Sequence, residues 1–185
     1  MAVVRVSASE ISACGGTLND FIGGQLEALR TEPMDVKERA AAVLHALAEQ
    51  GAENAISIYK LNGLKALIKL ADVGSHNAMS SAAAACAVII STKSEYATEA
   101  AKLGGIPPLA KVLRSATGGA QEAAAGAIAS ISAAAENVQD VIKAGVSRSY
   151  RTLMTVIFPA CQNDATGSSH THTGHRSSRD APEAG

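Results

Sequence analysis

The sequence predicts an all-α fold, a solenoid of about three stacked helical repeats, and three observations support this prediction. Three stretches, which begin at Ile22, Leu64 and Ile106, align without a gap at a spacing of 42 residues. Within each stretch, apolar residues recur at the three- and four-residue intervals of an amphipathic helix. Ala, Leu, Ile and Val supply most of the apolar content, and only 3% of residues are aromatic, which favours closely packed helices over a sheet. A solenoid offers an extended surface to another macromolecule rather than an enclosed pocket for chemistry.

Each period opens with a short helix. Leu64, Leu67 and Ile68 form one apolar stripe, as the helical period requires. The Pro107–Pro108 pair stands where the third of these helices would begin, a position at which a missing N–H costs nothing. We expect the opening helices at residues 22–30, 64–72 and 106–115.

A longer helix follows in each period, and its centre is rich in alanine: AAAVLHAL, AAAACAVI and AAGAIASI. Small residues let neighbouring helices approach closely, so we expect Ala83 and Ala125 to be buried between stacked helices. Cys86 falls on a core position and is predicted to act as a small apolar filler. Asp35 and Glu38 have the spacing of a capping box for the first long helix. We expect the long helices at residues 35–49, 77–91 and 119–134.

A third, shorter helix closes each period, and we expect these helices at residues 53–61, 94–103 and 136–144. They end at Asn62–Gly63, Gly104–Gly105 and Gly145. Asn and Gly can adopt the positive φ that terminates many helices. Each unit is therefore three helices in about 42 residues, and it must stack on its neighbours to bury its apolar faces.

The third unit carries motifs of a known family. Its sequence, GGIPPLAKVLRSATGGAQEAAAGAIASISAAAENVQDVIKAG, closely resembles the armadillo repeat in its Gly-Gly-Ile-Pro-Pro-Leu opening, its Gln-Glu-Ala-Ala-Ala-Gly-Ala-Ile run and its Glu-Asn…Ala-Gly close. The resemblance is strongest over residues 104–145, clear over 53–93 and weaker over 21–50. It implies a right-handed superhelix of α-helices whose concave groove is lined by the long helix of each repeat. It also implies a non-enzymatic module that binds or scaffolds other proteins.

The groove positions differ from those of the nuclear-import members of this family. In those members, a Trp and an Asn four residues later form ladders that clamp an extended basic peptide. This chain has small residues instead: Ala42, Ala84 and Gly126 at the Trp position, and Ala46, Val88 and Ser130 at the Asn position. The resemblance therefore argues against import-signal binding and for a small, neutral groove.

Glu38, Ser80 and Glu122 lie one helical turn before these positions, on the same face. They are either solvated residues at the start of each long helix or a weakly acidic rim for a partner. We expect a peptide or helix of another protein to contact the following residues: Glu38, Ala42, Ala46, Ser80, Ser81, Ala84, Val88, Glu122, Gly126 and Ser130.

The sequence divides into four parts. Residues 1–21 are expected to be an irregular segment or partial cap, and residues 22–147 the repeat array. Residues 148–160 resemble a degenerate fourth opening helix, in which the apolar stripe Leu153–Phe158 predicts self-association or contact with a continuation of the array. Residues 161–185 are polar and rich in Gly and Ser, and we expect them to be disordered.

Several functions are disfavoured. A net charge of −1 gives no electrostatic basis for nucleic-acid binding, and no apolar run is long enough to cross a membrane. The sequence contains no catalytic constellation and no cofactor motif. His170, His172 and His175 fall in the expected disordered tail, so we predict no structural metal site.

Three widely spaced cysteines fit a reducing compartment. We therefore expect a cytoplasmic protein, with the nucleus as an alternative.

Two other functions stay open within the armadillo resemblance. One is the substrate-recognition array of a U-box-type ubiquitin ligase, although no U-box sequence precedes Ile22. The other is a vacuolar or membrane adaptor, for which Cys14 would be the acylation candidate.

Overall fold

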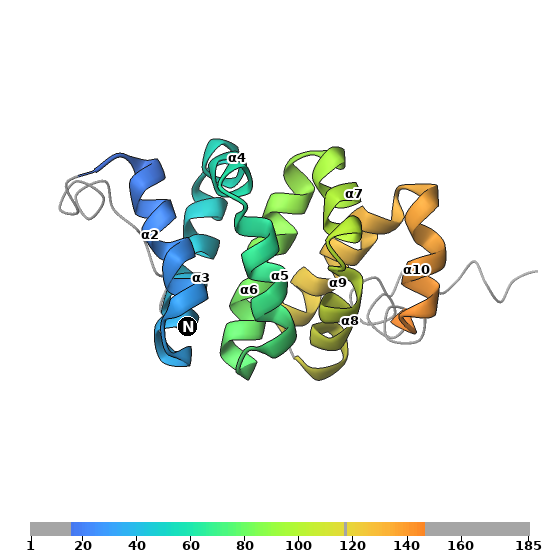
Figure 1. Cartoon of the computed structure of the whole chain (residues 1–185). Helices are drawn as coiled ribbons and strands as arrows, with labels where there is room; N and C mark the ends of the chain where they lie inside the picture. The colour runs from blue at the N-terminus through green and yellow to red at the C-terminus, as the bar shows by residue number, and fades with distance from the viewer. Residues whose placement is uncertain (1–15, 117, 147–185) are drawn as a thin grey trace, which may run out of the picture.

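The computed structural model describes residues 16–116 and 118–146, and these residues form a row of stacked α-helices (Figure 1). These residues contain no strand, and the all-α prediction is confirmed. Every helix predicted between residues 22 and 145 is present, with ends that shift by a few residues; the last divides into a 3₁₀ turn and a short α-helix. The elements are α2 (Leu18–Thr31), α3 (Met34–Gln50), α4 (Ala52–Lys60), α5 (Gly63–Val73), α6 (His76–Thr92), α7 (Ser94–Lys102), α8 (Ile106–Ser115), α9 (Gly119–Ser132), η1 (Ala135–Asn137) and α10 (Val138–Lys143).

The first helix begins earlier than the sequence interpretation placed it. Residues 18–21, which we expected to be irregular, belong to α2. Thr17 and Asp20 form the capping box: Thr17 N donates to Asp20 Oδ2 at 2.8 Å, and Asp20 N donates to Thr17 Oγ1 at 3.3 Å. These two bonds satisfy N–H groups that have no partner inside the helix. The Asp20 carboxylate accepts from both the backbone N–H and the hydroxyl of Thr17, and these hydrogen bonds hold the pKa of the carboxyl below its usual value.

The predicted Asp35–Glu38 capping box is wrong. Pro33 is the N-cap of α3 and makes no side-chain capping bond, so Asp35 already lies inside the first turn. Glu38 instead accepts a hydrogen bond from the hydroxyl of Ser75, the N-cap of α6. Ser75 Oγ in turn accepts from Ala78 N at 3.2 Å. Glu38 therefore ties α3 to the start of the next long helix.

The closing turns behave as the sequence predicts. Asn62, Gly104 and Gly145 have φ values of 60°, 74° and 70° and end the third helix of each repeat. Gly63 has a different role, because a Cβ there would lie 2.5 Å from Ile58 Cγ2 and 2.7 Å from the Ile58 carbonyl oxygen. The turn between α4 and α5 thus needs a left-handed residue followed by one without a side chain.

The opening helices and the long helices of the repeats form two rows that share one core. The long helices α3, α6 and α9 pack side by side in one row, and α2, α5 and α8 pack in the other; Figure 1 shows α5 and α8 in front of α6 and α9. Ala83 and Ala125 are buried, as predicted. Equivalent positions of the three repeats fill the space between the rows: Ala40, Ala82 and Ala124; Leu44, Cys86 and Ile128; Leu47, Ile89 and Ile131. Complete burial of each Leu or Ile contributes about 1.5–3 kcal/mol.

Several sequence predictions lie outside the described residues. These are the fourth-repeat helix at 148–160 with its stripe Leu153–Phe158, the tail at 161–185 with its three histidines, and Cys14. In the part of the chain that the structure describes, no helix has the length and apolar character needed to cross a membrane.

Candidate functional site

The predicted binding residues lie on the row of long helices. Because α6 packs against both α3 and α9, positions one repeat apart are neighbours on this face. Among the ten predicted residues none is buried: Glu122 and Gly126 are exposed and the other eight are partly exposed. The structure therefore gathers small residues of three helices into one continuous strip: Ala42, Ala46, Ala84, Val88, Gly126 and Ser130. We call this strip the α3–α6–α9 strip.

The strip and the predicted residues beside it offer few free polar groups. Ser80 Oγ donates to the His76 carbonyl at 2.8 Å, and Ser130 Oγ donates to the Gly126 carbonyl at 3.0 Å. A hydroxyl that donates to a carbonyl of its own helix cannot donate the same hydrogen to a partner. Glu38 is half-buried and hydrogen-bonded to Ser75, so Glu122 is the only exposed one of the two predicted rim carboxylates. A partner would therefore meet mainly apolar surface here.

A further carboxylate lies beside the strip. Glu49 is exposed on α3, and its Oε1 lies 3.3 Å from His45 Nε2. Glu49 is not among the residues predicted from the sequence, although it stands seven residues after Ala42 and so faces the same side of the helix. Together with Glu38 and Glu122, it makes the edges of the strip mildly acidic.

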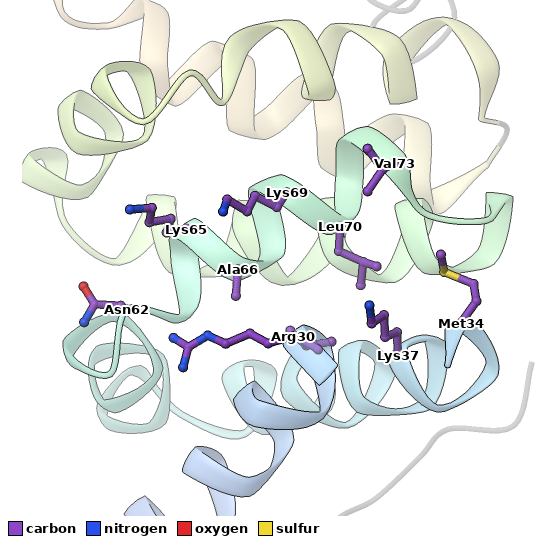
Figure 2. Close-up of a pocket in the computed structure, with 10 residues that line it drawn as sticks. Arg30, Met34, Lys37, Asn62, Lys65, Ala66, Lys69, Leu70 and Val73 are labelled. Atoms are coloured by element: carbon purple, nitrogen blue, oxygen red, sulfur yellow. The ribbon is translucent and has the colours of Figure 1, made fainter. Parts of the chain in front are cut away.

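A cavity of about 660 Å³ lies in the other row of helices, between α2, α5 and the beginning of α3 (Figure 2). Four cationic side chains line it: Arg30, Lys37, Lys65 and Lys69. This site could not be predicted from the sequence, because its residues come from three helices of two repeats and form no basic run. The one available signal was Lys65 and Lys69, whose spacing of four places them on one helix face.

The fold is that of armadillo repeat proteins. No family model and no curated protein sequence matches the chain. Among solved structures, it is similar to a designed armadillo repeat protein, YIII(Dq.V1)4CPAF in complex with the peptide (KR)4, with 25% identity and a TM-score of 0.63 over 72% of this chain and 56% of that one. The designed armadillo repeat protein YIII(Dq)4CqI is 28% identical, with a TM-score of 0.59 over 68% of this chain and 53% of the other.

Computationally designed armadillo repeat proteins for modular peptide recognition give a TM-score of 0.64 at 24% identity, over 80% of this chain and 69% of theirs. The chain thus spans little more than half the length of the first of these solved structures. The class is established as an armadillo-type α-solenoid. In this fold, the α3–α6–α9 strip lies on the row formed by the long helices.

Proposed function

We propose that this protein is a non-enzymatic binding scaffold that holds a peptide or helix of another protein along the α3–α6–α9 strip. The observation that supports it best is the alignment of small, partly exposed residues on three long helices that pack side by side. Two of the similar solved structures bind or are designed to recognise peptides, which supports a peptide-binding scaffold of the same architecture.

The chemistry of the strip specifies the kind of occupant. Alanine, glycine and valine leave room for large side chains of the partner but offer no hydrogen-bonding groups of their own. Apolar contact should supply most of the affinity. The carboxylates of Glu49 and Glu122 at the edges favour an occupant that also carries a cation. We therefore propose an apolar segment flanked by Lys or Arg, bound in a cytoplasmic or nuclear setting.

A single bulky substitution tests this proposal. Ala84 lies partly exposed at the centre of the middle helix, so Ala84→Arg would place a long charged side chain across the strip. A partner recovered with the intact chain should lose most of its affinity for this variant, as measured by titration calorimetry. Ala52→Arg is the matched control, because Ala52 is exposed at the start of α4.

The two variants separate the outcomes clearly. Loss with Ala84→Arg and retention with Ala52→Arg would support binding on the strip. Equal affinity of both variants for the partner would remove the strip from the mechanism. Charge reversal at Glu38 is a poorer test, because it would also break the bond to Ser75 that joins α3 to α6.

A further inference from the structure

The cavity between the first two repeats is basic at its rim and apolar at its base. Leu29 and Leu70 are buried, and Ala66, which also lines the cavity, is partly exposed. Around this base stand Arg30 of α2, Lys37 of α3, and Lys65 and Lys69 of α5. Figure 2 shows Arg30 extending along the gap toward Asn62, and Lys37 pointing toward Leu70. No Asp or Glu is among the lining residues.

These positive charges have little compensation from the protein. Arg30 Nη1 lies 3.4 Å from Glu27 Oε2, but both side chains are more than half exposed, and such surface pairs are weak. Lys37, Lys65 and Lys69 form no ion pair or side-chain hydrogen bond with any residue that the structure describes. Four cations around one cavity repel one another, and a bound anion would relieve that repulsion.

At the next joint along the array, the equivalent positions carry different residues. Forty-two residues further on, Lys37 corresponds to Met79, which is buried, and Lys65 corresponds to Pro107. Arg30 corresponds to Asp72 and Lys69 to Lys111, whose ammonium donates to the Asp72 carbonyl oxygen. At the second joint, only one of the four equivalent positions carries a cation, and that ammonium is already hydrogen-bonded to the protein. The basic cavity is a property of this joint and not of the repeat in general.

The cavity also has an apolar end. Met34 and Val73 are 39% and 72% exposed, and Figure 2 shows them together at the right, away from Asn62 and Lys65. An occupant that satisfies both parts would place carboxylates beside Arg30, Lys65 and Lys69 and an apolar side chain against Met34 and Val73. An acidic protein segment has this combination of groups.

We propose that this cavity binds an acidic segment of a partner protein, with carboxylates over the cations and one apolar side chain at the Met34–Val73 end. The site is separate from the α3–α6–α9 strip, since it is built from α2, α5 and the beginning of α3. The array would then have two binding faces of opposite electrostatic preference. One favours apolar segments with a cation, and the other favours acidic ones.

A fluorescent peptide of consecutive glutamates followed by a leucine is a direct probe, measured by fluorescence anisotropy with the full chain. The double variant Lys65→Glu/Lys69→Glu should bind it at least about tenfold more weakly, because reversing charges at a binding site replaces attraction with repulsion. The matched control is Lys60→Glu/Lys102→Glu. Both of these lysines are exposed, they end α4 and α7, and they lie outside the cavity.

The control should keep its affinity within about twofold, and the wild-type affinity should fall as salt rises. A second peptide with serine in place of leucine should bind more weakly to the wild-type chain. The Ala84→Arg variant should bind the acidic peptide normally, so a failure of the strip proposal would leave this result unaffected. Circular dichroism melting curves establish that all variants are folded.

Two results would overturn the proposal. One is equal weakening by the two double variants, which would indicate a response to net charge alone. The other is a wild-type chain that binds phosphatidylserine vesicles, or inorganic phosphate, but not the glutamate peptide. That result would assign the cations to a lipid or phosphate ligand instead of a protein segment.

Discussion

Neighbouring residues Asn62 and Gly63 have different tasks in the turn that joins α4 to α5. Asn62 supplies the left-handed backbone, and Gly63 supplies the absence of a side chain beside Ile58. Gly63→Ala would force its Cβ to within 2.5 Å of Ile58 Cγ2. We expect this overpacking to lower the free energy of unfolding by about 1–3 kcal/mol, as measured by urea denaturation.

Gly24→Ala is the matched control for Gly63→Ala. Gly24 is exposed within α2, and a Cβ there would meet nothing within 4 Å. Alanine has less backbone freedom to lose than glycine, so this variant should be more stable by about 0.5–1 kcal/mol. If Gly63→Ala were stabilising as well, the close approach to Ile58 would have no energetic consequence.

Cys86 illustrates how burial controls reactivity. Its side chain is fully buried in the core, and burial raises the pKa of its thiol to about 12. Iodoacetamide reacts with the thiolate, so peptide mapping should find Cys86 unmodified in the native chain and modified in guanidinium chloride. Rapid native labelling would mean that α6 opens often enough to expose its core face.

The raised pKa of the Cys86 thiol determines the pH range in which this group affects the free energy of unfolding. An unfolded thiol has a pKa of about 8.5, below that of the folded state. Its contribution is therefore fully present below about pH 8.5 and is lost as the pH rises toward the folded value of about 12. Near neutral pH, the Cys86 thiol should add no pH dependence to the melting temperature.

At the scale of whole elements, asparagines bind the ends of two of the long helices, α3 and α9. Asn54 Nδ2 donates to the Leu47 carbonyl at 2.9 Å, and Asn137 Nδ2 donates to the Ile131 carbonyl at 3.0 Å. Leu47 and Ile131 are equivalent positions two repeats apart. Each bond satisfies a carbonyl in the last turn of a helix, where acceptors lack partners.

Removing one of these side chains should destabilise the array. Asn137 is buried, so Asn137→Ala would leave a carbonyl without its partner and should cost about 1–3 kcal/mol. Thermal unfolding followed by circular dichroism measures the loss. Gln139→Ala, at an exposed position two residues later, should change the melting temperature little. Equal effects of the two variants would show that the hydrogen bond is unimportant.

The contact between long helices can be tested in the same way. Ala83 is completely buried in α6, whereas its neighbour Ala84 is partly exposed. Ala83→Leu should overpack the core and cost about 1–3 kcal/mol, while Ala84→Leu should be nearly neutral. Denaturant titration of both variants decides the register of α6, and the opposite order of stabilities would show that the helix is rotated.

Periodicity was enough to predict these elements, because every long helix must bury one face against its neighbour. The capping boxes were harder. Asp35 and Glu38 have the right spacing, but Pro33 already has the extended backbone of an N-cap (φ −58°, ψ 164°), so the helix starts before Asp35 can cap it. Thr17 and Asp20 form the actual box with an aspartate in place of the usual glutamate or glutamine.

The positions of the candidate binding residues were predictable only where they recur at the repeat spacing of 42 residues. The α3–α6–α9 strip follows from the repeat alignment, since each residue has a counterpart 42 positions away. The basic cavity does not, because Lys37 has Met79 as its counterpart and meets Lys65 and Lys69 only after two repeats stack. A residue that differs from its counterpart in the next repeat, such as Lys37, indicates a site only when the structure shows which residues it meets between the two repeats.

At the scale of the whole molecule, stability should decrease from the centre toward the ends. In the described array, α6 packs against long helices on both sides, whereas α2 and α10 belong to its outer parts (Figure 1). Stability in such arrays is approximately a sum of contacts between neighbours. Hydrogen exchange followed by mass spectrometry should therefore be slowest in α6. Equal protection of all helices would show that the array opens in a single step.

The alanine-rich contact between the long helices also determines how strongly the array bends. Alanine has no rotamers, so the distance between two repeats is set by the thickness of a methyl group and cannot be adjusted by side-chain rearrangement. A larger residue at Ala83 or Ala125 would push two repeats apart and change the angle between them. Every repeat beyond that joint would be rotated by the same angle. The size of the single residue at each such contact therefore sets the angle between two repeats, and these angles together set the radius of curvature. Partner length and shape can change through such wedges while the residues that touch the partner remain the same.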